Sequence, residues 1–137
     1  MRPHVWKEDE IFVFGSNVDG VHGAGAALFA RMHCGAQLGV GEGLTGNSYA
    51  LPTCRHAGVP LTLDEVRESV ETFLSLADGE PDMTFFLTRV GCGLAGFTDT
   101  EIAWLFAEIP PNVIVPPEWD GLTWDDKNRG IMSTWNR

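Results

Sequence analysis

Residues 11–36 read IFVFGSNVDGVHGAGAALFARMHCGA and place an apolar run, a glycine-rich turn and a helical pattern in direct succession. The run 11–14 is short and β-favouring, which is typical of a strand buried on both faces. Ala27, Leu28 and Met32 share one face of a helix over 24–33. The glycines between strand and helix indicate a backbone that adopts positive φ or closely approaches another group.

The same alternation continues along the chain. Thr62–Glu65 and Thr98–Glu101 have the S/T-x-x-E form of a capping box, and each precedes an apolar helical stripe. Further strands are predicted at 48–51, where Pro52 ends the run, at 83–88 and at 112–115. Parallel strands need crossover connections, so a β-α-β-α-β-α-β order favours an α/β fold with a largely parallel sheet and helices on its faces.

Two glycine-rich stretches, 15–25 and 91–96, follow predicted strands. In open parallel sheets, ligands bind beyond the carboxyl ends of the strands. We therefore expect both stretches to lie at one edge of the sheet and to form the ligand site.

The length of 137 residues and the 44% hydrophobic content suit a single domain, 1–137, with a core over about 11–115. The tail 116–137 breaks the alternation and carries Trp119, Trp124 and Trp135 among polar residues. The tail either wraps and packs against the domain through its tryptophans or forms a partner surface or a cover over the site.

The formal net charge of −10 argues against duplex DNA as a partner, because DNA-binding proteins neutralise phosphates with Lys and Arg. A small phosphate ligand stays possible, since backbone N–H groups can bind one phosphate whatever the net charge. Three cysteines without a Cys-x-x-Cys pair favour reduced thiols and argue against a metal site. With no apolar stretch of about 20 residues, we expect a cytoplasmic protein that contacts no membrane. We also expect that it needs no cofactor. The sequence leaves its oligomeric state undetermined.

Three familiar glycine motifs fit poorly. Gly15 and Gly20 have Walker A spacing, but Val21-His22 follows instead of Lys and Ser/Thr. The G-x-G-x-x-G at 41–46 precedes a strand instead of opening a helix. The G-x-G-x-x-G at 91–96 has the correct context, but too little chain follows it for a nicotinamide-dinucleotide fold.

Taken together, four segments resemble a macrodomain, the ADP-ribose-binding fold. They are Asn17 after the first strand, HGAGAA at 22–27, FARMHCGA at 29–36 and RVGCGL at 89–94. The resemblance is greatest to the subgroup that contains the terminal ADP-ribose glutamate-linkage hydrolases, and it extends to stand-alone macro-like proteins of bacteria and phages. It covers roughly residues 11–115 and implies a three-layer α/β/α fold.

The resemblance also implies a ligand and its contacts: ADP-ribose or a related NAD-derived nucleotide. Gly23, Ala24 and Gly25 would bind the distal ribose and let amides approach the pyrophosphate, while Asn17 would contact the distal ribose. The second phosphate loop would comprise Gly91, Cys92, Gly93, Leu94, Ala95, Gly96 and Phe97. Paired N–H-rich loops at helix starts suit a diphosphate on physical grounds as well.

The chain departs from the hydrolase subgroup at its catalytic groups. Ala95 stands where the subgroup has a catalytic aspartate, and the only lysines, Lys7 and Lys127, lie outside the loop that carries the subgroup's catalytic lysine. The early strand and Gly-Asp turn that read adenine in the family are absent as well. Adenine recognition must therefore differ, or the preferred ligand is not plain ADP-ribose.

Four other residues are candidates for chemistry. His22 is a candidate general base or ribose ligand, and the alternative is that it hydrogen-bonds the backbone of its loop. Asp99 is a candidate catalytic acid or a carboxylate that stabilises a helix start. Arg89 would pair with a phosphate or with an internal carboxylate, and Cys92 is a nucleophile or a small loop residue.

Two functions from different classes follow. The first is hydrolysis of an ADP-ribosyl linkage, in which an ADP-ribosylated macromolecule would be the partner. The second is a non-catalytic module that reads or sequesters the nucleotide. A macro-like scaffold that uses its tryptophan tail for protein contacts is the third alternative.

Overall fold

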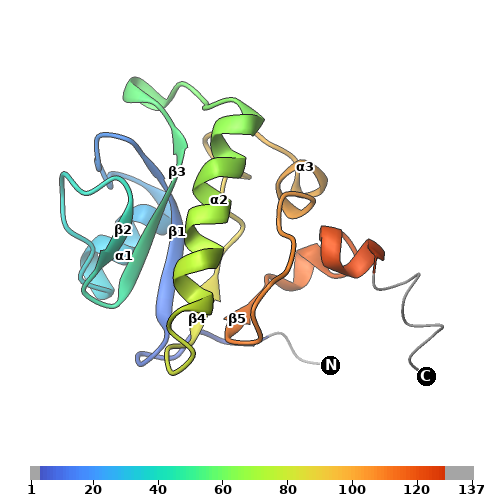
Figure 1. The fold of residues 1–137 in the computed structure, drawn as a ribbon. Coiled ribbons are helices and arrows are strands. Elements are labelled where there is room, and N and C mark those ends of the chain that lie inside the picture. The colour runs from blue at the N-terminus through green and yellow to red at the C-terminus, as the bar shows by residue number, and fades with distance from the viewer. Residues whose placement is uncertain (1–3, 129–137) are drawn as a thin grey trace.

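The computed structural model describes residues 4–128 and contains a five-stranded sheet in the order β2-β3-β1-β4-β5 (Figure 1). The strands β1, β3 and β4 pair in parallel, as do β4 and β5, whereas β2 is antiparallel to β3. The predicted α/β class with a mostly parallel sheet is therefore confirmed. The strands are β1 (Ile11–Asn17), β2 (Gly43–Thr45), β3 (Ser48–Cys54), β4 (Phe85–Leu87) and β5 (Val113–Ile114), and the helices are α1 (Gly25–His33), α2 (Leu63–Asp78) and α3 (Asp99–Ala103).

Strand β3 does not end at Pro52, as the sequence predicted, but continues to Cys54. The partner β2 pairs with β3 only as far as Ala50, so no neighbour on that side needs an N–H group at Pro52. Strand β2 itself was not predicted. It forms a hairpin with β3 through Gly46 and Asn47, and this hairpin accounts for the G-x-G-x-x-G pattern at 41–46.

Helices cover both faces of the sheet (Figure 1). On one face, Phe12, Phe14 and Ala50 pack with Ala30 of α1. The larger cluster on the other face joins the sheet to α2, α3 and the C-terminal segment. Strand residues that alternate between these faces explain why the run 11–14 is apolar throughout.

The three α-helices differ at their N-termini. Thr62 with Glu65 and Thr98 with Glu101 form complete capping boxes at α2 and α3, as predicted. Helix α1 begins after Ala24, which has no side-chain acceptor, and its first turn carries no acidic residue. No helix within residues 4–128 combines the length and apolar character needed to cross a bilayer.

The C-terminal segment joins the core at Trp119, which lies in the short 3₁₀ helix η2 (Pro117–Trp119). Its side chain is fully buried, and its ring centroid lies 5.2 Å from that of Phe106. Trp124 is 39% exposed, and Trp135 lies outside the described residues. The segment as far as Trp119 is therefore part of the domain's packing.

Candidate functional site

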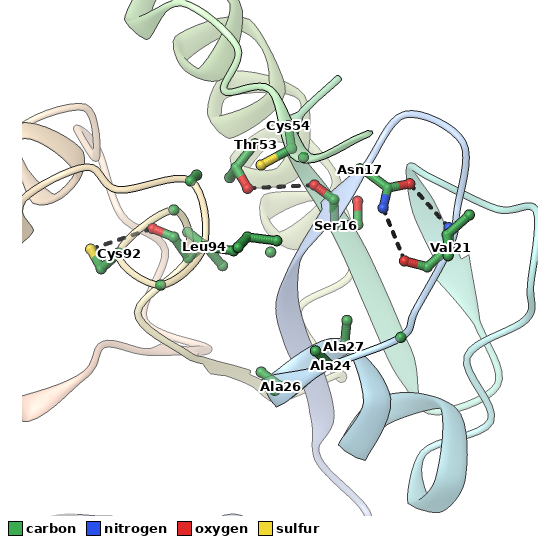
Figure 2. A pocket seen from close by; sticks show the side chains of 18 of the residues that line it. Ser16, Asn17, Val21, Ala24, Ala26, Ala27, Thr53, Cys54, Cys92 and Leu94 are labelled. Atoms are coloured by element: carbon green, nitrogen blue, oxygen red, sulfur yellow. Dashed lines mark hydrogen bonds between the residues drawn. The ribbon is translucent and has the colours of Figure 1, made fainter. Parts of the chain in front are cut away.

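A cavity of about 860 Å³ opens at the carboxyl ends of β1, β3 and β4. Its walls include loop 1, residues 18–24 between β1 and α1, and loop 2, residues 88–98 between β4 and α3. Figure 2 shows loop 2, with Cys92 and Leu94, facing the start of α1 and the turn from Asn17 to Val21. The prediction that both glycine-rich stretches meet at one sheet edge is confirmed, and the volume is in the range of small-molecule sites.

Most of the predicted ligand-binding residues line this cavity. Those that do are Asn17, Gly23, Ala24, Gly25, Arg89, Gly91, Cys92, Gly93, Leu94 and Ala95. Gly96 and Phe97 do not line it, because Phe97 turns towards the core beneath the loop. The two predicted catalytic residues, His22 and Asp99, are outside the lining too.

The floor of the cavity depends on close approach at Gly15. A Cβ at this position would lie 3.3 Å from the Gly91 nitrogen and 3.3 Å from Thr53 Oγ1. The β1–β3 register shifts here, with Ser16 opposite Pro52 and Asn17 opposite Cys54, so Thr53 is an extra residue on β3. This bulge turns the end of β3 into the cavity wall.

Loop 1 owes its shape to contacts with its neighbours. The Asn17 side chain donates to the Val21 carbonyl at 2.9 Å and accepts from the Val21 amide at 3.0 Å (Figure 2). Gly20 has a φ of +70°, and a Cβ there would lie 2.4 Å from the Val40 nitrogen. The backbone of the loop around Gly39 is thus the group that approaches Gly20.

Gly23 and Gly93 present the opposite case. Neither has a φ in the left-handed region, and a Cβ added to either would meet no atom within 4 Å. Packing and backbone strain therefore give no reason for glycine at these positions. Both line the cavity, so their missing side chains keep it open and leave their amides accessible to a ligand.

Unpaired backbone amides gather at both walls. Residues 25–27, in the first turn of α1, and residues 93–95, in loop 2, donate no hydrogen bond to any group in the described part of the chain. All six residues line the cavity. Such amides at a helix N-terminus and in a tight loop attract anions.

Arg89 and Asp99 hold the two ends of loop 2 together. Arg89 Nε and Nη2 donate to the two Asp99 oxygens at 2.8 and 2.6 Å, and Trp119 Nε1 donates to Asp99 Oδ1 at 2.7 Å. The hydrogen bond from Arg89, together with that from Trp119, lowers the pKa of Asp99 to about 2. The guanidinium thus pairs with an internal carboxylate, one of its two predicted alternatives.

Cys92 lines the cavity, but its thiol is poorly suited to nucleophilic attack. Burial, and then the Asp99 carboxylate, raise its pKa to about 12. The thiolate is the reactive form, and at neutral pH this site holds almost none of it. The structure therefore favours the alternative in which Cys92 is a small loop residue.

His22 belongs to loop 1, and its side chain is fully buried. Its Nε2 donates to the Gln37 carbonyl at 3.0 Å, and its ring meets Phe14 edge-on. Its Nδ1 is buried without a hydrogen-bond partner among the described residues. His22 thus bonds to backbone, as one of its two predicted alternatives had it, although the acceptor lies outside loop 1. A fully buried ring that does not line the cavity has no access to a ligand there.

Sequence reasoning missed the Asp19 and His56 side chains, which both line the cavity. His56 Nδ1 and Asp19 Oδ2 lie 2.5 Å apart, joining loop 1 to the 3₁₀ turn η1 (His56–Gly58) after β3. A signal was present, because His56 follows a predicted strand and the rule for carboxyl ends applies to β3 as well. Across residues 4–128, no group of His, Cys, Asp and Glu side chains is arranged to hold a metal ion.

Comparison with known proteins gives no family: no protein-family model, curated protein or solved structure matches this chain at a significant level. The chemical character of the cavity therefore follows from its own residues. These residues offer two clusters of unpaired amides, a mainly small and apolar lining, and one Asp–His pair.

Proposed function

We propose that this protein binds ADP-ribose or a closely related NAD-derived nucleotide, with the diphosphate held between α1 and loop 2. The observation that carries the proposal is the pair of unpartnered amide clusters, 25–27 and 93–95, on facing walls of one cavity. A diphosphate has two anionic groups, and each cluster can bind one of them. The macrodomain resemblance of the same two segments supports the same ligand.

The charge distribution supports an anionic ligand. The chain has 19 acidic residues, yet Asp19 is the one carboxylate in the cavity lining formed by residues 4–128. Asp19 accepts a hydrogen bond from His56 Nδ1, so its carboxylate is engaged with a protein donor. The cavity lining therefore opposes an entering diphosphate with a single carboxylate.

The remaining lining suits the sugar and base of a nucleotide. Val21 and Leu94 stand at the rim with exposed side chains, and Leu94 is 84% exposed. Ligand sites combine such apolar surface with a few oriented polar groups. The Ser16 and Thr53 hydroxyls beside the floor are buried and donate to the carbonyls of Gly41 and Ser16, so they shape the cavity wall.

Binding is a better description than hydrolysis through the two residues proposed from sequence. His22 is buried with its Nε2 bonded to a carbonyl, and Asp99 is occupied by Arg89 and Trp119. Neither side chain lines the cavity. A hydrolytic role would need other groups.

Isothermal titration calorimetry with ADP-ribose tests the proposal, with AMP as the ligand that lacks a diphosphate. We expect ADP-ribose to bind and AMP to bind at least tenfold more weakly, a difference of about 1.4 kcal/mol. Gly93→Ala should weaken ADP-ribose binding by about tenfold, because its methyl group enters the cavity beside the amides.

Gly79→Ala is the matched control. Gly79 has a negative φ, lies at the end of α2 away from the cavity, and would place its Cβ 3.5 Å from the nearest atom. This variant should bind as the wild type does. Folded wild-type protein that gives no heat with ADP-ribose would overturn the proposal.

A further inference from the structure

The Asp19–His56 pair has the geometry of an oriented imidazole. Asp19 Oδ2 lies 2.5 Å from His56 Nδ1, so Nδ1 carries the proton that it donates to the carboxylate. Nε2 is then the basic nitrogen, and no group in residues 4–128 bonds to it. A carboxylate that fixes the tautomer in this way leaves the other nitrogen ready to accept a proton.

The imidazole is accessible from the cavity. His56 lines the cavity and its side chain is 87% exposed, while that of Asp19 is 43% exposed. The other imidazoles of the chain, those of His4, His22 and His33, are all described and do not line the cavity. His56 is consequently the one imidazole at this site within the described residues.

Other charged groups near the pair are already engaged. Arg55, next to His56 in the chain, pairs with Glu65 of α2. Arg89 in loop 2 pairs with Asp99. On the side of η1 that meets loop 2, Leu94 Cδ2 lies 3.6 Å from a Cβ built at Gly58, so the contact there is apolar. Asp19 is thus the ionisable partner that orients His56.

We propose that His56 is the general base, and Asp19 its positioning residue, in hydrolysis of an oxygen-linked ADP-ribosyl group held in this cavity. The proposal rests on the nucleotide binding proposed above. A water oxygen bonds to the anomeric carbon while one of its protons passes to His56 Nε2. The bond from that carbon to the substituent oxygen breaks, and the electron pair leaves with the substituent. The imidazolium then releases its proton to solvent.

The same lining defines the class of substituent. Among the described residues, the cavity has no unpaired carboxylic acid that could protonate a leaving oxygen, because Asp19 is bonded to His56. The substituent must therefore depart as a stable oxyanion. An aryl ADP-riboside, whose phenolate leaves without protonation, is the probe that fits this requirement.

The experiment measures ADP-ribose released from para-nitrophenyl ADP-ribose, together with ADP-ribose affinity by calorimetry for every variant. Wild type should turn over the probe. His56→Gln should lower kcat by about 100-fold and leave the ADP-ribose Kd within about twofold. His33→Gln, an exposed histidine at the end of α1, is the matched control and should leave both values unchanged.

The role of Asp19 in positioning His56 is tested by the pH profile, which a purely structural role of Asp19 would not alter. Wild-type kcat/KM should rise with pH, because only a neutral imidazole accepts a proton. Asp19→Asn should lower kcat by about 10-fold or more, since an amide does not hold the Nδ1–H tautomer, and should change this pH profile. Asp19→Glu should restore part of the rate.

The outcomes separate the two proposals. Wild type that binds ADP-ribose but releases no product refutes the general base and leaves the binding function intact. Turnover that survives in His56→Gln refutes the assignment of the base. Absence of ADP-ribose binding in folded wild-type protein overturns both.

Discussion

At the scale of single residues, the environment of His22 decides its role. Its ring lies 5.0 Å from that of Phe14, centroid to centroid, and its Nε2 bonds to the carbonyl of Gln37, which is 15 positions later in the chain. The sequence identified a histidine in a glycine loop but could not show that residues 35–41 fold over it. Burial of a loop side chain depends on such non-local contacts, so residue type alone left its two roles open.

We expect His22→Ala to destabilise the protein by about 2–4 kcal/mol, because it removes a fully buried ring and leaves a cavity. Denaturant unfolding followed by circular dichroism measures this change. His33→Ala, at an exposed position, should change stability by less than about 0.5 kcal/mol. Unchanged stability of His22→Ala would contradict a structural role.

At the scale of elements, local signals located most of the fold. Both capping boxes and the apolar runs of β1, β3 and β4 were identified from sequence, since caps and periodicity are properties of neighbouring residues. Strand β2 was missed because it has only three residues and its pairing with β3 is what makes it a strand. The end of β3 at Cys54 likewise depends on pairing, because β1 continues to pair with β3 as far as Cys54 after β2 has ended.

The uncapped start of α1 allows one substitution to raise the stability of the fold while weakening ligand binding. Ala24 has the extended backbone of an N-cap residue and an exposed side chain. Ala24→Asp should stabilise the protein by about 1 kcal/mol, because its carboxylate accepts from the free amides. The same carboxylate should weaken ADP-ribose binding by at least about tenfold, because it occupies the amides proposed to bind the phosphate and repels the phosphate group.

Thermal unfolding and calorimetry on one preparation measure the two opposite effects. Thr62→Asp at the N-cap of α2 is the control, since it keeps a capping side chain at a residue outside the cavity lining and should leave binding unchanged. If Ala24→Asp raised stability without weakening binding, the phosphate would have to be held elsewhere.

At the scale of the whole molecule, one ion pair connects the site to the C-terminal segment. Asp99 joins Arg89, Trp119 and the start of α3, so loop 2 is held by a residue that follows it by more than 20 positions. The sequence placed Arg89 beside the loop and left open whether it pairs with a phosphate or an internal carboxylate. The answer depended on where Trp119 packs, which no local pattern could show.

Acid unfolding tests this connection. The folded-state pKa of Asp99, about 2, lies below its ordinary value of 3.8, so its contribution is complete above about pH 4 and is lost as the pH falls towards 2. Asp99→Asn should be less stable than wild type at pH 7, and the difference should shrink between pH 4 and 2. Asp82→Asn, at an exposed carboxylate, should parallel wild type throughout. A difference independent of pH would refute this origin.

The contrast between an acidic exterior and a cavity with a single carboxylate has a consequence for selectivity. A long polyanion must run along the exterior, where the formal net charge of −10 repels many of its phosphates at once. A single dinucleotide-sized anion enters the cavity, where it is repelled by fewer of the surface carboxylates. The protein would thus discriminate between a monomeric nucleotide and a polymer built from the same unit without making any contact specific to either.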